Sequence, residues 1–221
     1  MKVALCLYGI VGSVEDKFGI GKQLDYQIAL EYYKKNFLNV NDVDVFIHTW
    51  SIDQKWGLEK GYNPVLSLYE PQIQFHPDIR THSIHSRWNS TQKVVQLKKQ
   101  YEEQCGFTYD CVFIGRLDLA FLTPMVLSEY DMNYFYASHW TDEQGEIRFL
   151  GEGFLDLWFF SNSKNMDFFG DLYDKMGLYT NNAHIMSREH AVNVIGEDKI
   201  RYTKRRFKDH DIVRRLLGCK K

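Results

Sequence analysis

The chain has 221 residues, enough for one substantial hydrophobic core and short for two domains. Its 27 basic and 29 acidic residues give a formal net charge of -2, so no overall field favours nucleic acid or an anionic membrane surface as a partner. Hydrophobic residues make up 44% of the chain, which excludes extensive disorder. No stretch approaches the ~20 apolar residues of a membrane span, so we predict a soluble protein.

Strands and helices alternate along the first part of the chain. The continuous apolar run at residues 3–8 predicts a strand buried on both faces. A loop with four glycines follows at 9–21, then a helix at 22–37 and a second strand at 43–47. This order is a βαβ unit, whose crossover is expected to be right-handed.

The remaining elements continue this alternation after a turn-rich segment at residues 51–71. A short strand at 73–75, a helix at 86–104 and a clear apolar strand at 111–114 follow in order. The sequence then predicts strands at 133–138 and 155–160, helices at 165–176 and 187–194, and a basic tail of undecided structure at 199–215. The chain is therefore predicted to be an α/β domain with a Rossmann-like, mostly parallel N-terminal sheet flanked by helices.

Polar residues stand at the ends of three predicted strands. Gly9 ends the first, Thr49 follows the second, and Arg116 and Asp118 follow the strand at 111–114. In such sheets ligands lie beyond the carboxyl ends of the strands. We therefore expect Gly9, Thr49 and Asp118 to line one cleft, with Asp156 facing it.

The glycine-bearing loop is a candidate for phosphate binding through backbone amides, with Gly9 and Val11 nearest the strand. Lys17 and Lys22 favour an anion there. The loop matches neither the Walker A pattern nor the dinucleotide pattern GxGxxG. A surface loop without ligand is the alternative that the glycines leave open.

Arg116 and Asp118 carry the most information. A carboxylate at the rim of a sheet is costly to bury without a cation or metal partner. A divalent ion would bridge Asp118 to a diphosphate, and Arg116 would hold a phosphate or ribose oxygen. The alternative is a structural Arg–Asp pair that ends the strand.

Two further groups are candidates. Arg87, among serines at the predicted start of a helix, suits phosphate binding, although Ser86 or Ser90 as a helix cap explains the pattern equally well. Glu152 and Asp156 precede an apolar strand, where burial would raise the pKa of Asp156 and suit general-base work. Asp156 as a partner of backbone amides is the alternative.

His184 and the basic tail are less specific. His184 is a candidate metal ligand, with an ordinary polar histidine as the alternative, and the HExxH pattern is absent. The tail at residues 204–208 (KRRFK) suits an anionic donor or acceptor, or a solvated face.

Five segments in chain order resemble a group of small GT-A-type glycosyltransferase-like proteins, found in surface-polysaccharide gene clusters and viral genomes. The segments are residues 2–9 (KVALCLYG), 44–50 (DVFIHTW), 86–93 (SRWNSTQK), 109–119 (YDCVFIGRLDL) and 156–159 (DLWF). The resemblance implies one domain over 1–221, with a nucleotide-binding half at 1–120 and an acceptor half at 121–221. The four cysteines show no CxxC or metal-type spacing and indicate reduced thiols, so we expect the protein in the cytoplasm, or in the host cytoplasm if it is viral.

The resemblance implies transfer of a sugar from a nucleotide-sugar donor to a glycan or another hydroxyl acceptor. Proteins of this type commonly hold Mn²⁺ or Mg²⁺ with a DxD motif. Here Asp118 matches the second acid and Arg116 replaces the first, so Arg116 itself is a candidate to neutralise the diphosphate. If the reaction inverts, Asp156 is the expected general base and Glu152 the second candidate. The alternatives are a non-catalytic carbohydrate- or nucleotide-binding protein and a nucleotidyltransferase.

Overall fold

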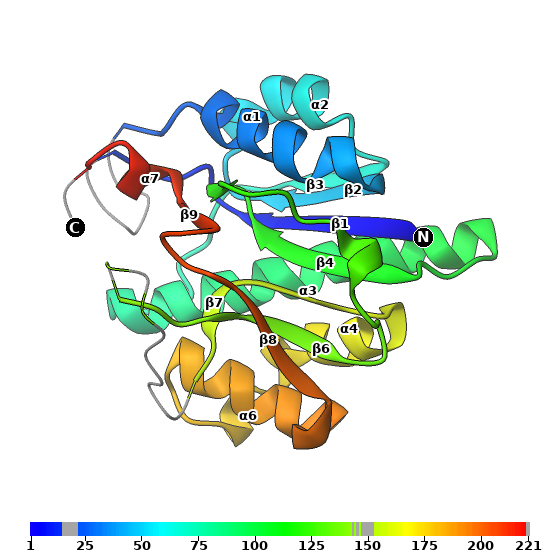
Figure 1. Ribbon diagram of the computed structural model, residues 1–221. Helices are drawn as coiled ribbons and strands as arrows, with labels where there is room; N and C mark the ends of the chain where they lie inside the picture. The colour runs from blue at the N-terminus through cyan, green and yellow to red at the C-terminus, as the bar shows by residue number, and fades with distance from the viewer. Residues whose placement is uncertain (15–21, 143, 145, 147–152, 220–221) are drawn as a thin grey trace.

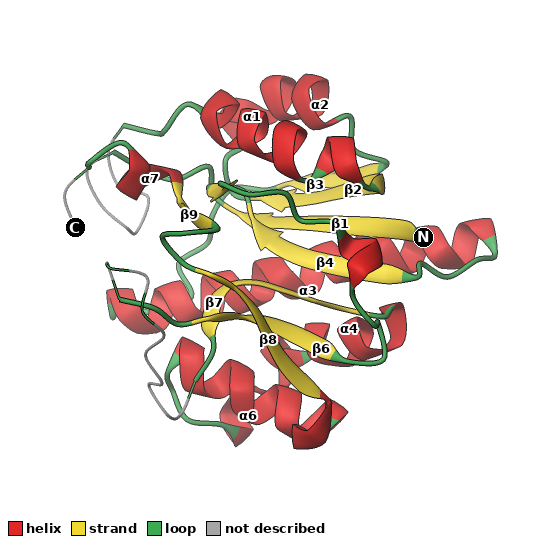
Figure 2. Ribbon diagram, in the orientation of Figure 1, coloured by secondary structure: helices red, strands yellow, loops and turns green. Residues whose placement is uncertain are grey.

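A computed structural model describes residues 1–14, 22–142, 144, 146 and 153–219. A seven-stranded sheet runs through the molecule, with helices on both faces (Figures 1 and 2). Its strands stand in the order β3-β2-β1-β4-β7-β6-β8. Their bounds are β1 Lys2–Gly9, β2 Asp42–Thr49, β3 Leu66–Tyr69, β4 Cys111–Arg116, β6 Phe135–His139, β7 Leu155–Ser161 and β8 Ile200–Arg205.

The direction of β7 matters for the site. β1 pairs in parallel with β2 and β4, β2 with β3, and β6 with β8, whereas β7 is antiparallel to both of its neighbours. The amino end of β7 therefore lies at the same edge as the carboxyl ends of the parallel strands. A second, two-stranded sheet of β5 (Leu119–Phe121) and β9 (His210–Ile212) lies at this edge, on the left of Figure 1.

The helices form two outer layers. α1 (Tyr26–Asn36) and α2 (Lys55–Tyr62) cover one face, and α3 (Ile79–Cys105), α4 (Ser163–Gly170) and α6 (Ala183–Ile195) cover the other. The short helices α5 and α7 span Leu172–Lys175 and Val213–Leu216. Each layer buries its own apolar cluster against the sheet, because the residues of a strand alternate between its two faces.

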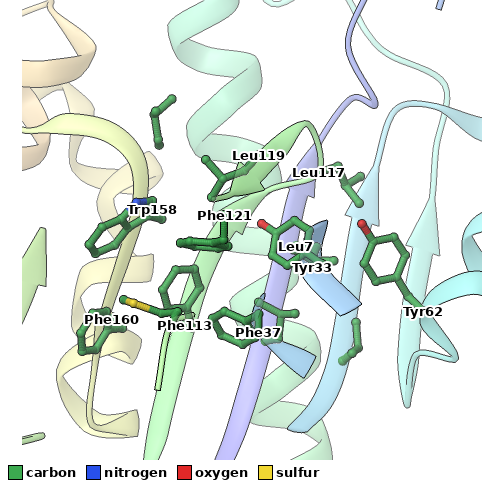
Figure 3. Packing of buried hydrophobic residues seen from close by; sticks show 14 of the residues in the cluster. Leu7, Tyr33, Phe37, Tyr62, Phe113, Leu117, Leu119, Phe121, Trp158 and Phe160 are labelled. Carbon is green, nitrogen blue, oxygen red and sulfur yellow. The ribbon is translucent and has the colours of Figure 1, made fainter. Parts of the chain in front are cut away.

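Aromatic packing fixes the end of β4 (Figure 3). The ring centroid of Phe37 lies 4.8 Å from that of Phe113, and the ring centroid of Tyr33 lies 5.7 Å from that of Phe121. The Tyr33 hydroxyl donates a hydrogen bond of 2.8 Å to the backbone oxygen of Arg116. Helix α1 thus holds the strand end from which the Arg116 side chain projects.

The α/β fold with a mostly parallel sheet is confirmed, and several boundaries are corrected. The predicted strand at 73–75 is wrong, since the third strand is β3 and the segment before it contains α2. α3 begins at Ile79 rather than at 86, because the Asp78 side chain accepts a hydrogen bond from the backbone N–H of Thr81. Ser86 and Ser90 therefore lie inside the helix and do not cap it.

The second half differs in detail. The predicted helix at 165–176 is divided into α4 and α5, and the predicted helix at 187–194 is part of the longer α6. The tail at 199–215 is ordered as β8, β9 and α7. Among the described residues, none of the helices has the length and apolar character needed to span a bilayer.

Candidate functional site

A cleft lies at the carboxyl edge of the sheet, in two adjoining compartments of about 200 Å³ and about 380 Å³. The residues shared by both are Ile10, Ser83, Arg116, Asp156 and Ala183. The first compartment is also lined by Tyr8, Gly9, Trp50, Gln72, His82, Ile84, Ser86 and Arg87. The second is also lined by Gly12, Ser13, Asp118, Trp140, Leu155, Leu157, His184, Arg206, Ile212 and Arg214.

Arg116 and Asp118 form a bidentate ion pair. Arg116 donates from Nε to Oδ1 of Asp118 at 2.7 Å and from Nη2 to Oδ2 at 2.6 Å. Burial works against the charge of Arg116, but the Asp118 carboxylate raises the pKa of the guanidinium above its ordinary value. The Arg116 side chain stays 31% exposed, whereas that of Asp118 is 5% exposed. The arginine is therefore the member of the pair that a ligand can reach.

Asp156 is held between an arginine and a histidine at the amino end of β7. One oxygen lies 3.0 Å from Nε of Arg87, and the other lies 3.2 Å from Nδ1 of His184. Burial alone would raise the pKa of Asp156, but His184, Arg87 and Arg116 together hold it well below its usual range. The expectation of a raised pKa is wrong, because the charges around the carboxyl outweigh its desolvation.

Arg87 and Tyr8 support the backbone beside Asp156. Nη2 of Arg87 and the Tyr8 hydroxyl donate to the backbone oxygen of Asp156 at 2.8 and 3.1 Å. The Arg87 guanidinium carbon lies 3.5 Å from the ring centroid of Trp88. Burial raises the pKa of Tyr8 to about 12, with Arg87 acting in the opposite direction, so the phenol is neutral at pH 7. Arg87 reaches the cleft from inside α3, not from its first turn.

A buried chain of polar groups fixes the end of β1. The backbone N–H of Gly9, which has a φ of 96° that favours glycine, donates to Oγ of Ser90 at 2.9 Å. Ser90 contacts Nδ1 of His48 at 2.6 Å, and Nε2 of His48 contacts Glu70 at 3.0 Å. Glu70 also pairs with Lys93. Burial lowers the pKa of His48 to about 4, so this histidine is neutral at pH 7.

Replacing Ser90 by alanine is expected to lower the free energy of unfolding by about 1–3 kcal/mol, because Gly9 N–H and His48 lose a buried partner. For a chain of this size each kcal/mol corresponds to a fall of about 2–4 °C in Tm. Thermal unfolding of Ser90→Ala measures this. Gln96→Ala, exposed on the same helix, is the control for helix propensity. Equal Tm values for the two variants would contradict a supporting role for Ser90.

The structure brings most of the predicted site residues to one edge. Gly9, Arg87, Arg116, Asp118, Asp156 and His184 line the cleft. Thr49 does not line it, because its side chain is fully buried and accepts a hydrogen bond from the Ser51 backbone. The backbone N–H of Val11 donates to Oγ of Ser51 and is not free for a ligand. Glu152 and Lys17 lie outside the described residues.

Sequence reasoning missed the residues that reach the cleft from unexpected places. Tyr8 lies at the end of the first strand and was interpreted as part of its apolar run. Arg206 and Arg214 lie in the basic tail. The positive charge of this segment predicted an anionic ligand, but the sequence did not show where the tail lies in the fold. The pairing of β9 with β5, together with the hydrogen bond from Val213 N–H to the Asp118 backbone oxygen at 2.8 Å, brings that tail to the end of β4.

The divalent cation expected at Asp118 and His184 stays a prediction. Both oxygens of Asp118 bind Arg116, and Nδ1 of His184 faces Asp156 and the backbone oxygen of Phe154. In the described part of the chain, no three histidine, cysteine or carboxylate side chains are grouped as a metal site. As they stand, these residues do not fit a metal-ligand set, since a cation at Asp118 would have to displace the Arg116 guanidinium.

Comparison with known proteins establishes the fold. No model of a protein family and no curated protein sequence matches the chain. The CTP:phosphocholine cytidylyltransferase from Streptococcus pneumoniae is similar in structure, with a TM-score of 0.54 and 9% sequence identity. The match covers 98% of this chain and 97% of that one. The Rossmann-like arrangement therefore extends over nearly the whole chain.

Proposed function

We propose that this protein is a transferase that takes its group from an activated nucleotide. The observation that supports this most is the position of Arg116, whose partly exposed guanidinium stands between the two compartments of the cleft. A guanidinium matches the geometry of phosphate oxygens and remains charged at any working pH. The phosphates of the nucleotide bind at this junction, with the nucleoside in the first compartment beside Gly9 and Trp50.

The site fits nucleotidyl transfer better than glycosyl transfer. An oxygen of the acceptor attacks the α-phosphorus of a nucleoside triphosphate, the new O–P bond forms, and pyrophosphate leaves with the bonding electrons. Such a reaction depends on alignment and on neutralising charge. Asp156, whose carboxylate pairs with Arg87 and His184, is a weak proton acceptor, and an ionised phosphate acceptor requires none. The similarly folded protein is by name a cytidylyltransferase.

Glycosyl transfer from a nucleotide sugar is the second candidate. Residues 10–25, between β1 and α1, contain no arginine, whereas a nucleotidyltransferase would favour an arginine in this loop. The segments that resemble GT-A-type glycosyltransferases supply Gly9, Arg87, Arg116, Asp118 and Asp156 to the same cleft. In this reaction a glycan or other hydroxyl attacks the anomeric carbon, and a nucleoside diphosphate leaves.

The two reactions release different products, so one experiment separates them. The protein is incubated with nucleoside triphosphates and a panel of phosphorylated acceptors, and pyrophosphate release is measured. A parallel series uses nucleotide sugars with glycan acceptors and measures nucleoside diphosphate release. Arg116→Gln serves as the inactive control in both. Pyrophosphate release supports the first candidate and nucleoside diphosphate release the second. Nucleotide binding without either product would favour a non-catalytic nucleotide-binding protein.

A further inference from the structure

A buried arginine lines the second compartment. Arg214, on α7, is 9% exposed, and its Nη1 atom is buried with no hydrogen-bond partner among the described residues. Its side chain lines the compartment. A buried cation is costly unless an anion neutralises it. The arrangement is therefore incomplete without an anionic ligand.

Two neighbouring carboxylates that the structure describes, Asp211 and Asp118, do not supply that anion. Nε of Arg206 lies 3.0 Å from one oxygen of Asp211, and Nε of Arg215 lies 3.4 Å from the other. Asp118, a carboxylate that lines the same compartment, binds Arg116 with both oxygens. Among the residues that the structure describes, Asp211 and Asp118 are thus both committed to other arginines.

Arg87, in the same cleft, is an arginine whose charge is compensated within the protein. Its Nη1 also has no hydrogen-bond partner in the described part of the chain, but its guanidinium stacks on Trp88 and pairs with Asp156. Among the described residues, neither an aromatic ring nor a carboxylate pairs with the Arg214 guanidinium. The two arginines therefore differ in what they require from a ligand.

Arg214 is held in place by the fold. β9 pairs with β5 through Leu119 and Ile212, and the backbone N–H of Val213 donates to the backbone oxygen of Asp118. These contacts attach the C-terminal segment to the end of β4, beside Arg116. Arg116, Arg206 and Arg214 then line one compartment, on the side away from Gly9 and Trp50.

We propose that the second compartment binds a phosphate group of the acceptor, with Arg214 as its main ligand and Arg206 beside it. The assignment of this phosphate to the acceptor rests on the proposed function. The presence of a phosphate site at Arg214 does not depend on it. Guanidinium groups bind phosphate with paired, charge-assisted hydrogen bonds. Arg206 and Arg214 line only this compartment and not the one beside Gly9, so the nucleotide and the acceptor phosphate bind side by side. The substrate class that follows is a phosphorylated small molecule.

Calorimetry with inorganic phosphate, in the presence and absence of saturating CTP, tests this. The wild type is expected to bind phosphate in both conditions. Arg214→Gln is expected to weaken phosphate binding about 10- to 100-fold and to change CTP affinity by less than about threefold. Its Tm is expected to equal or exceed that of the wild type, because a buried unpaired charge is removed. Lys208→Gln, an exposed charge in the same tail, is the matched control.

The other outcomes are distinguishable. Competition between phosphate and CTP, with Arg214→Gln weakening both, would assign Arg214 to the nucleotide's own phosphates and overturn the proposal. Undiminished phosphate binding by Arg214→Gln would also overturn it. Wild-type protein that binds phosphate through Arg214 but binds no nucleotide would contradict the proposed function and leave the phosphate site standing.

Discussion

Asparagine at position 156 is expected to lower the free energy of unfolding by about 3–5 kcal/mol, the usual cost of breaking a buried ion pair. Asp156 lies between Arg87 and His184, and its loss would leave the Arg87 guanidinium without a carboxylate to neutralise it. Burial opposes protonation of His184, but Asp156 raises its pKa, which makes the histidine dependent on this carboxylate. For a chain of this size the loss corresponds to a fall in Tm of about 6–20 °C.

The pH dependence follows from the depressed pKa of Asp156. A carboxyl group with a lower pKa in the folded than in the unfolded state adds stability above its unfolded pKa, about 4 for aspartate. That stability is lost as the pH falls below this value. The difference in stability between wild type and Asp156→Asn is therefore largest at neutral pH and shrinks on acidification below about pH 4.

Denaturant unfolding at a series of pH values measures both effects. Asp53→Asn, an exposed aspartate in a surface turn, is the matched control and is expected to leave stability within about 0.5 kcal/mol of the wild type. If Asp156→Asn instead melts with the wild type and loses only transfer activity, Asp156 is a general base and its role in the ion-pair group is secondary. The structure favours the stabilising role.

The first half of the fold was predictable because its strands are continuous apolar runs that end in glycine or a polar residue. Residues 3–8 and 111–114 became β1 and β4 with small changes at their ends. β3 was missed, since it has four residues at the edge of the sheet and is only partly buried. β8 and β9 were missed because they are short and carry charged residues, and their pairing partners lie about 60–90 positions earlier.

The site was predictable where it depends on strand ends. Gly9, Arg116 and Asp118 share an edge because parallel strands bring their carboxyl ends together, and the sequence contains that information. The roles of the same residues were not predictable. Thr49 is turned into the fold by its hydrogen bond with the Ser51 backbone, and the low pKa of Asp156 depends on Arg87 and His184, which come from two different helices. Such long-range charge contacts leave no local pattern.

Arg116→Gln is expected to weaken nucleotide binding, whereas Asp118→Asn is not. Arg116→Gln removes the guanidinium at the junction of the two compartments and leaves Asp118 as an unpaired carboxylate facing the phosphates. We expect nucleotide affinity to fall about 100-fold, in line with the loss of charge-assisted hydrogen bonds. Asp118→Asn frees Arg116 from its partner, so nucleotide affinity is expected to stay equal or to rise.

The double variant separates binding from folding. Arg116→Gln with Asp118→Asn removes both members of the pair, so it is expected to regain the stability that Arg116→Gln alone loses while its nucleotide affinity remains low. Arg201→Gln, an exposed arginine on β8 that does not line the cleft, is the control for loss of one positive charge. Thermal unfolding and calorimetry with CTP and with UDP give the two readouts.

The same variants decide how the phosphates are neutralised. If Arg116 neutralises them, wild-type affinity for UDP and CTP is expected to be equal in Mn²⁺ and in EDTA, and Asp118→Asn keeps that affinity. If Asp118 instead binds a divalent cation, affinity depends on Mn²⁺ in the wild type and that dependence disappears in Asp118→Asn. The paired contacts of 2.7 and 2.6 Å from Arg116 occupy both oxygens that such a cation needs. We therefore expect nucleotide binding to be independent of Mn²⁺. Arg116 stands at the position of the first acid of a DxD motif and neutralises the phosphates directly, without a metal.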